Sequence, residues 1–106
     1  MDILKEAVSD VYCGHVVVSA TRTVLTAIEL PPVHKGVTLR APGSTDITPN
    51  TAPVWVGGSG VTADSDAGTG GMPICPGESI FIPTEKLNKL WVISTIADQD
   101  LAWMAL

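Results

Sequence analysis

Hydrophobic and polar residues alternate in short runs along most of the chain, and this period of two is typical of β-strands. In the run GVTLRA, Val37 and Leu39 lie on one face of the predicted strand and Thr38 lies on the other. Each run is about four to eight residues long, as strands of globular proteins usually are. The predicted strands cover residues 15–20, 23–30, 36–41, 54–58, 78–83, 89–95 and 101–106.

Residues that favour turns fill the segments between these runs. Pro31 and Pro32 end one predicted strand, and residues 42–53 are rich in proline, glycine, serine, aspartate and asparagine. Short strands at regular spacing, with such turns and without a second helix, are typical of β-sandwiches and small barrels. We therefore expect an all-β protein, with a single β-sandwich or jelly-roll-like domain over residues 14–106.

Only residues 1–13 have helical rather than strand spacing, and Gly14 is expected to end this segment. A helix of this length is marginally stable alone. We therefore expect a short N-terminal helix that packs on the domain, or an arm that becomes ordered on a partner. The apolar residues at helical spacing are Leu4, Ala7, Val8 and Val11.

Composition and charge narrow the choice of partners. The 106 residues fit one domain, 45% of them are hydrophobic and only 16% are charged, with a net charge of −5. A surface so poor in charge suggests faces that other subunits cover. The few basic residues are scattered, so we expect no nucleic-acid partner. The first residues lack the basic region of a signal peptide, and no apolar run reaches membrane-spanning length. We expect a soluble protein made in a cytoplasm, with no membrane partner.

The glycine-rich stretch after residues 54–58 raises the question of a phosphate or metal site. A phosphate-binding loop would open a helix and carry a lysine, and this stretch does neither. Asp64 and Asp66 could supply oxygen ligands to Ca²⁺, but the regular acids and closing glutamate of an EF-hand are absent. We expect a loop tip that faces solvent or a partner and holds no metal, with a Ca²⁺ site as the alternative.

No arrangement of residues in the sequence requires catalysis. His15 and His34 have no third zinc ligand near them in the sequence, and no nucleophile-elbow motif surrounds a serine. The glutamates that could form a catalytic pair, Glu29, Glu78 and Glu85, lie in exposed positions or have no reason for a raised pKa. We expect a protein that is not an enzyme and has no cofactor.

Cysteine and tryptophan leave alternatives open. Cys13 and Cys75 lack metal spacing and are expected to be buried free thiols, with a disulfide between them as the alternative. Trp55, Trp91 and Trp103 stand between aliphatic residues in predicted strands, where packing in the core or against a subunit is the usual role. Stacking on a sugar is the alternative for the tryptophans.

Three segments, VWVGGSGVT, GGMPICPGESIFIP and LNKLWVIST, resemble as an ordered set the small structural proteins of tailed-phage virions. The likeness extends from about Val16 to Leu106. The chain departs from the pattern in the insert ADSDAGTGG and in residues 1–13. The matching positions are Val56, Gly57, Val61, Thr62, Pro76, Gly77, Glu78, Leu87, Leu90 and Ile93.

The resemblance implies a β-sandwich or jelly roll that is often trimeric, located on the virion and without catalytic residues. The leading role is capsid decoration, or cementing, in which the chain binds the major capsid protein at the outer surface and bridges neighbouring subunits. The alternative is a carbohydrate- or receptor-binding β module of a phage fibre or tail. Under the leading role Trp55 and Trp103 are candidate subunit contacts, and Asp64 and Asp66 are candidate loop contacts. The arm would bind its neighbour through Ile3, Leu4, Val8 and Val11.

Overall fold

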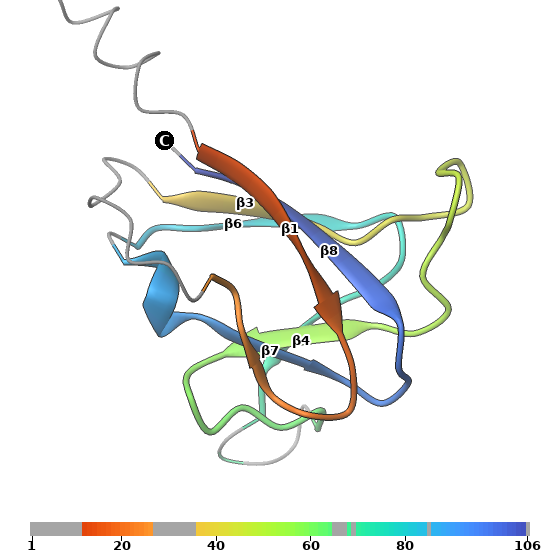
Figure 1. Cartoon of the computed structure of the whole chain (residues 1–106). Coiled ribbons are helices and arrows are strands. Elements are labelled where there is room, and N and C mark those ends of the chain that lie inside the picture. Colours follow the sequence, from red (N-terminus) through yellow and green to blue (C-terminus); the bar gives the residue numbers. More distant parts are fainter. Residues whose placement is uncertain (1–11, 27–35, 65–67, 69, 85, 106) are drawn as a thin grey trace, which may run out of the picture.

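Eight β-strands and one short 3-10 helix form the part of the chain that the computed structural model describes, residues 12–26, 36–64, 68, 70–84 and 86–105 (Figure 1). The prediction of an all-β domain is therefore confirmed. The elements are β1 (Tyr12–Val18), β2 (Thr23–Val24), β3 (Val37–Arg40), β4 (Val54–Gly57), β5 (Met72–Ile74), β6 (Ser79–Ile82), η1 (Leu87–Lys89), β7 (Trp91–Ser94) and β8 (Gln99–Ala105).

The strands form two four-stranded antiparallel sheets that pack into a β-sandwich. Sheet A has the order β1-β8-β3-β6, and sheet B has the order β2-β7-β4-β5. The first strand thus pairs with the last, β2 with β7, β3 with β6 and β4 with β5. Because these pairs alternate between the two sheets, the chain has the strand arrangement of a jelly roll.

The core lies between the two sheets and is made by the inward half of the alternating pattern. Val37 and Leu39 of β3 are completely buried, as their spacing predicts, while Thr38 between them is exposed. Ile80 and Ile82 of β6 are half-buried and pack against this core. The other large side chains that are fully buried are Val18, Val54, Val61, Ile74, Val92 and Leu101.

Gly14 is required for packing, and the expectation that it ends a helix is wrong. It lies inside β1, directly opposite Trp103 of β8. A Cβ atom at Gly14 would lie 2.7 Å from Cζ2 and 2.8 Å from Cε2 of the Trp103 indole. Trp103 is only 8% exposed, so its ring occupies the space that a side chain at Gly14 would need.

Gly14→Ala is expected to lower the free energy of unfolding by about 1–3 kcal/mol, because the ring or the strand must shift to admit the new methyl group. Urea denaturation of the full chain measures this change. Gly60→Ala is the matched control, since nothing lies within 4 Å of a Cβ at Gly60. Equal stability of the two variants would contradict the close approach of Trp103.

Two buried amides fix the segment 42–53 to the start of β8. The Asn50 side chain donates to the Asp100 carbonyl oxygen at 2.8 Å and accepts from the Asp100 N–H at 2.7 Å. The Gln99 side-chain oxygen accepts from the N–H groups of Thr51 and Ala52 at 2.8 Å and 3.0 Å. Strand β8 begins at Gln99, where these hydrogen bonds are made, two residues before the start at 101 that the sequence predicts.

Several predicted elements differ from the observed ones in length or lie partly outside the described residues. β2 covers only Thr23–Val24 of the strand expected at 23–30. β5 was not predicted, because its sequence MPI carries a proline and no alternation. Residues 1–11, with the proposed arm contacts Ile3, Leu4, Val8 and Val11, lie outside the described residues, and Tyr12–Val18 forms β1. Within the described ranges, no helix is long and apolar enough to cross a membrane.

Candidate interaction surface

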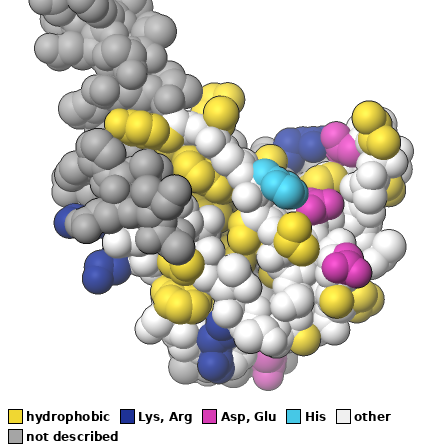
Figure 2. Space-filling model, in the orientation of Figure 1, with side chains coloured by type: hydrophobic (Ala, Val, Ile, Leu, Met, Phe, Trp, Pro, Cys, Tyr) yellow, Lys and Arg dark blue, Asp and Glu magenta, His cyan; other side chains and the backbone are white. Residues whose placement is uncertain are grey.

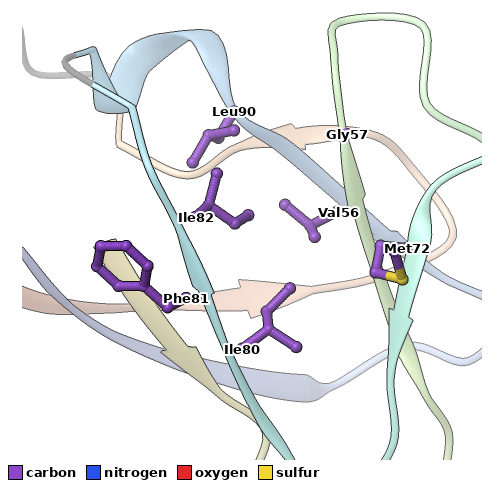
Figure 3. A pocket seen from close by; sticks show the side chains of 7 residues that line it. All are labelled: Val56, Gly57, Met72, Ile80, Phe81, Ile82 and Leu90. Atoms are coloured by element: carbon purple, nitrogen blue, oxygen red, sulfur yellow. The ribbon is translucent and has the colours of Figure 1, made fainter. Parts of the chain in front are cut away.

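An apolar groove of about 480 Å³ opens between the edge strand of sheet A and the edge strand of sheet B. In Figure 3, Ile80 and Ile82 of β6 point toward Val56 of β4, and Leu90 closes the upper end of the groove. The edge strands β5 and β6 thus lie on either side of an opening into the core. The lining residues are Val56, Gly57, Met72, Ile80, Phe81, Ile82 and Leu90.

The chemistry of the groove suits binding and gives no means of catalysis. None of the lining side chains is charged, titratable or able to donate a hydrogen bond. Its rim carries two large exposed side chains, Met72 at 62% and Phe81 at 56% exposure. Exposed apolar side chains that border a concave apolar site are typical of places where a partner docks.

Strand β6 can also add a further strand to sheet A. It pairs only with β3 in the described part of the chain, so its other edge has no ladder partner there. The Ala41 N–H donates to the Glu78 carbonyl oxygen, so Ala41 and Glu78 form a hydrogen-bonded pair. Hydrogen-bonded and non-hydrogen-bonded pairs alternate along an antiparallel ladder, so the backbone N–H and C=O groups of Ser79 and Phe81 are directed away from β3. The facing edge strand, β5, contains Pro73, which cannot donate to a ladder. An extended partner segment would therefore pair with β6.

A second apolar surface lies on the outer face of sheet B. Trp55 of β4 is opposite Ile93 of β7. At the next outward position of the same strand pair, Trp91 of β7 is opposite Gly57 of β4. Pairing with β5 and β2 adds Pro73 and Val24 to the same face. All of these side chains are half-buried. We call Val24, Trp55, Pro73, Trp91 and Ile93 the tryptophan face.

The three tryptophans therefore divide between core and surface. Trp103 belongs to the core cluster, which is one of the two roles expected for it. Trp55 lies on the outer face of sheet B with Trp91, which was not singled out as a subunit contact. Alternation along VWVG and WVIS could have shown that each strand has an outward tryptophan, but only the strand order places the two on adjacent strands.

The glycine-rich loop has a closed base and no cluster of metal ligands among the residues described. Thr62 and Gly70 form an isolated parallel bridge, and the Gly71 N–H donates to the Thr62 carbonyl oxygen at 3.1 Å. Asp64 is exposed, and Asp66 lies outside the described residues. Across the described ranges, no three histidine, cysteine, aspartate or glutamate side chains come together as a metal site would require.

The ion pairs of the described residues lie at the surface. His15 Nε2 is 3.0 Å from an Asp100 carboxylate oxygen, and the imidazole is 59% exposed. The Gly43 N–H donates to the Asp46 carboxylate at 2.7 Å, and the Arg40 guanidinium lies 3.0 Å from it. These two interactions, with the Gly43 bond the larger, lower the pKa of Asp46. The Asp46 pair stabilises the turn after β3 and does not face the groove, whose lining contains neither residue.

Both cysteines are free, as expected, but both are exposed, so the expectation that they are buried is wrong. Cys75 lies in the turn between β5 and β6, where its N–H donates to a Glu78 carboxylate oxygen at 2.9 Å. A side-chain hydrogen bond with the same carboxylate raises the pKa of the Cys75 thiol, with smaller contributions from desolvation and from the negative charge of Glu78. Since the thiolate is the reactive form, Glu78 keeps Cys75 less reactive than an ordinary exposed cysteine.

Glu78→Gln is expected to lower the pKa of Cys75 and to raise its alkylation rate near neutral pH by about two- to tenfold. Glutamine keeps the oxygen that accepts from the Cys75 N–H and removes the charge. The midpoint of the pH–rate profile should therefore move to lower pH. Iodoacetamide labelling followed by mass spectrometry measures the rate at each thiol, and Cys13, in β1, is the internal control. An unchanged profile at Cys75 would contradict the assigned cause.

The comparisons with known proteins add no relatives to this description. No protein-family model matches the sequence, and no curated protein and no solved structure shows significant similarity to the chain.

Proposed function

We propose that the chain is a structural protein of a phage virion that binds the outside of the capsid and bridges capsid subunits, without catalysing a reaction. The proposal rests mainly on the apolar groove and its exposed rim, Met72 and Phe81, which offer binding surface and no reactive group. The jelly-roll strand order and the ordered resemblance to virion proteins are consistent with this role.

A protein of this kind works through binding free energy alone. When it contacts two capsid subunits at once, separation of those subunits must also break its own contacts. A homotrimer at a threefold position would contact three subunits, and its modest single contacts would reinforce one another. The proposed partner is therefore the major capsid protein, and the proposed location is the capsid surface of a particle assembled in a bacterial host.

The tryptophan face supports one alternative function, recognition of a carbohydrate by a phage fibre or tail. Trp55 and Trp91 lie on adjacent strands of one outer face, and aromatic faces of this kind can stack on sugar rings. Titration with bacterial surface glycans would then quench tryptophan fluorescence. A Trp91→Ala variant would lose the quenching.

The composition of purified virions tests the leading proposal. Mass spectrometry of particles from the phage that encodes the chain should find it in a fixed ratio to the major capsid protein. Antibodies against the chain should label capsids and leave tails and fibres unlabelled. Absence of the chain from the particles would overturn the proposal, and label confined to fibres or tails would favour the carbohydrate-binding alternative.

A further inference from the structure

Strand β1 is an edge strand that lacks the features by which proteins usually keep edge strands from pairing. In the described part of the chain it pairs only with β8, so its other edge has no ladder partner there. Its seven residues, YCGHVVV, include no proline, lysine or acidic residue. The other edge strands are shorter, with two residues in β2, three including a proline in β5, and four in β6. Among the described strands, β1 therefore has the longest edge open to pairing.

The hydrogen bonds of β8 show which of its backbone groups are directed away from β1. The Asn50 side chain binds both the N–H and the carbonyl oxygen of Asp100, and the Asn50 N–H donates to Pro42, just beyond the end of β3. The Asp100 groups are therefore directed to the β3 side of β8. The next ladder agrees, because the Ala41 N–H donates to the Glu78 carbonyl oxygen and leaves the groups of the preceding residue for β8. Alternate residues of β8, beginning with Asp100, thus bond toward β3 and not toward β1.

The free edge of β1 consequently offers the backbone groups of Cys13, His15 and Val17. These residues are opposite the residues of β8 that bond toward β3, so their N–H and C=O groups point away from β8. Within the described ranges, no hydrogen bond occupies these backbone groups. The three side chains are exposed as well, with Val17 at 53%. In Figure 2, which has β1 and β8 in front, a histidine side chain lies at the surface beside an acidic one.

We infer that two copies of the chain pair antiparallel through β1, about a twofold axis that passes between their His15 residues and is normal to sheet A. This centre places Cys13 of each copy opposite Val17 of the other. Every outward-directed N–H and C=O group of the two strands then meets a partner, and the two copies of sheet A become one continuous sheet. A centre at any other residue of β1 leaves some of these groups without a partner in the strand.

The side chains of β1 are compatible with this register. On the inner face, Val16 of one copy lies opposite Gly14 of the other, so no two large side chains meet there. Tyr12 and Val16 are half-buried and pack against the core, and the second sheet would cover what remains exposed of them. On the outer face the two His15 side chains meet, and each has an Asp100 carboxylate of its own chain 3.0 Å away, which offsets their repulsion when they are protonated.

The inference is independent of the proposed function, because it concerns two copies of the chain in solution. A dimer presents the apolar groove twice and can bridge capsid subunits as a trimer would. Since its tests contain no capsid, their failure leaves capsid binding to be judged separately.

The native mass of the isolated full chain tests the pairing. Light scattering during size-exclusion chromatography should find a dimer at roughly 100 μM that dissociates on dilution. His15→Pro should weaken dimerisation at least about tenfold, because proline removes the N–H at the centre of the pairing. The domain should stay folded, since that N–H is not used in the ladder with β8. His15→Ala is the matched control, which keeps the N–H and should dimerise like the unchanged protein.

Disulfide cross-linking tests the register. In a Cys75→Ser background, Val17→Cys should form a disulfide with Cys13 of the other copy, since opposite residues of a hydrogen-bonded pair have Cα atoms about 5.5 Å apart. Cys75→Ser alone is the control, because its two Cys13 residues would lie about 14 Å apart along the strands, beyond the reach of a disulfide. A monomer at every concentration, an oligomer that His15→Pro leaves intact, or an equal yield of cross-linked product in the control would overturn the inference.

Discussion

Gln99→Leu is expected to lower the free energy of unfolding by about 2–4 kcal/mol. The Gln99 side chain is 3% exposed, and its oxygen accepts from the N–H groups of Thr51 and Ala52. Its nitrogen donates to the Thr51 hydroxyl at 3.2 Å and to the Ala97 carbonyl at 3.1 Å. Leucine has similar bulk but cannot accept a hydrogen bond from the buried Ala52 N–H. This N–H then stays buried without an acceptor, and no hydrogen bond offsets the free-energy cost of removing it from water.

Chemical denaturation monitored by tryptophan fluorescence measures the loss. Asn88→Leu is the control, since Asn88 also carries a side-chain amide but is half-buried, and its side chain makes no hydrogen bond within the described residues. We expect this control to change stability by less than about 1 kcal/mol. If Gln99→Leu is as stable as the control, segment 42–53 does not depend on the Gln99 amide.

Under the proposed function, Met72→Asp is expected to weaken binding to the capsid at least about 30-fold while the domain stays folded. Met72 is 62% exposed on the rim of the apolar groove, so a carboxylate there remains solvated in the free protein. In the complex the same carboxylate would be buried against an apolar partner surface without a counter-ion, which carries a large desolvation cost. Co-sedimentation with capsids over a range of protein concentrations measures the affinity.

Ile47→Asp is the matched control for this prediction, because Ile47 is fully exposed and does not line the groove. It introduces the same charge and should leave capsid binding within about threefold of the unchanged protein. If both variants bind as tightly as the unchanged protein, the groove is not the contact surface. If both fail to bind, the cause is net charge rather than position.

The fold class could be predicted from the sequence because the two-residue period is a local property. Val37 and Leu39 face the core as their alternation indicates. Strand order could not be predicted, since pairing of β1 with β8 joins residues at opposite ends of the chain and leaves no local signal. β5 was missed because Pro73 and the short MPI run resemble a loop, although proline is acceptable on an edge strand.

The candidate interaction surface could be predicted where it depends on the local pattern of the sequence, and could not be predicted where it depends on strand order. Ile80 and Ile82 could be expected to face inward, but only the meeting of β5 and β6 at one edge of the sandwich turns them into the wall of a groove. Phe81 and Met72 gave no signal in the sequence, because an outward apolar residue in a strand is common. Trp103 could not be separated from Trp55 and Trp91 until the register placed Gly14 beneath its ring.

The most direct test of the central claim is the stability of capsids with and without the chain. Under the proposed function, capsids of the phage that encodes the chain, assembled without it, should bind the purified protein to saturation at a fixed ratio to the major capsid protein. Their disruption temperature should then rise with the fraction of sites filled. Absence of saturable binding, or saturable binding that leaves the disruption temperature unchanged, would contradict a function in bridging capsid subunits.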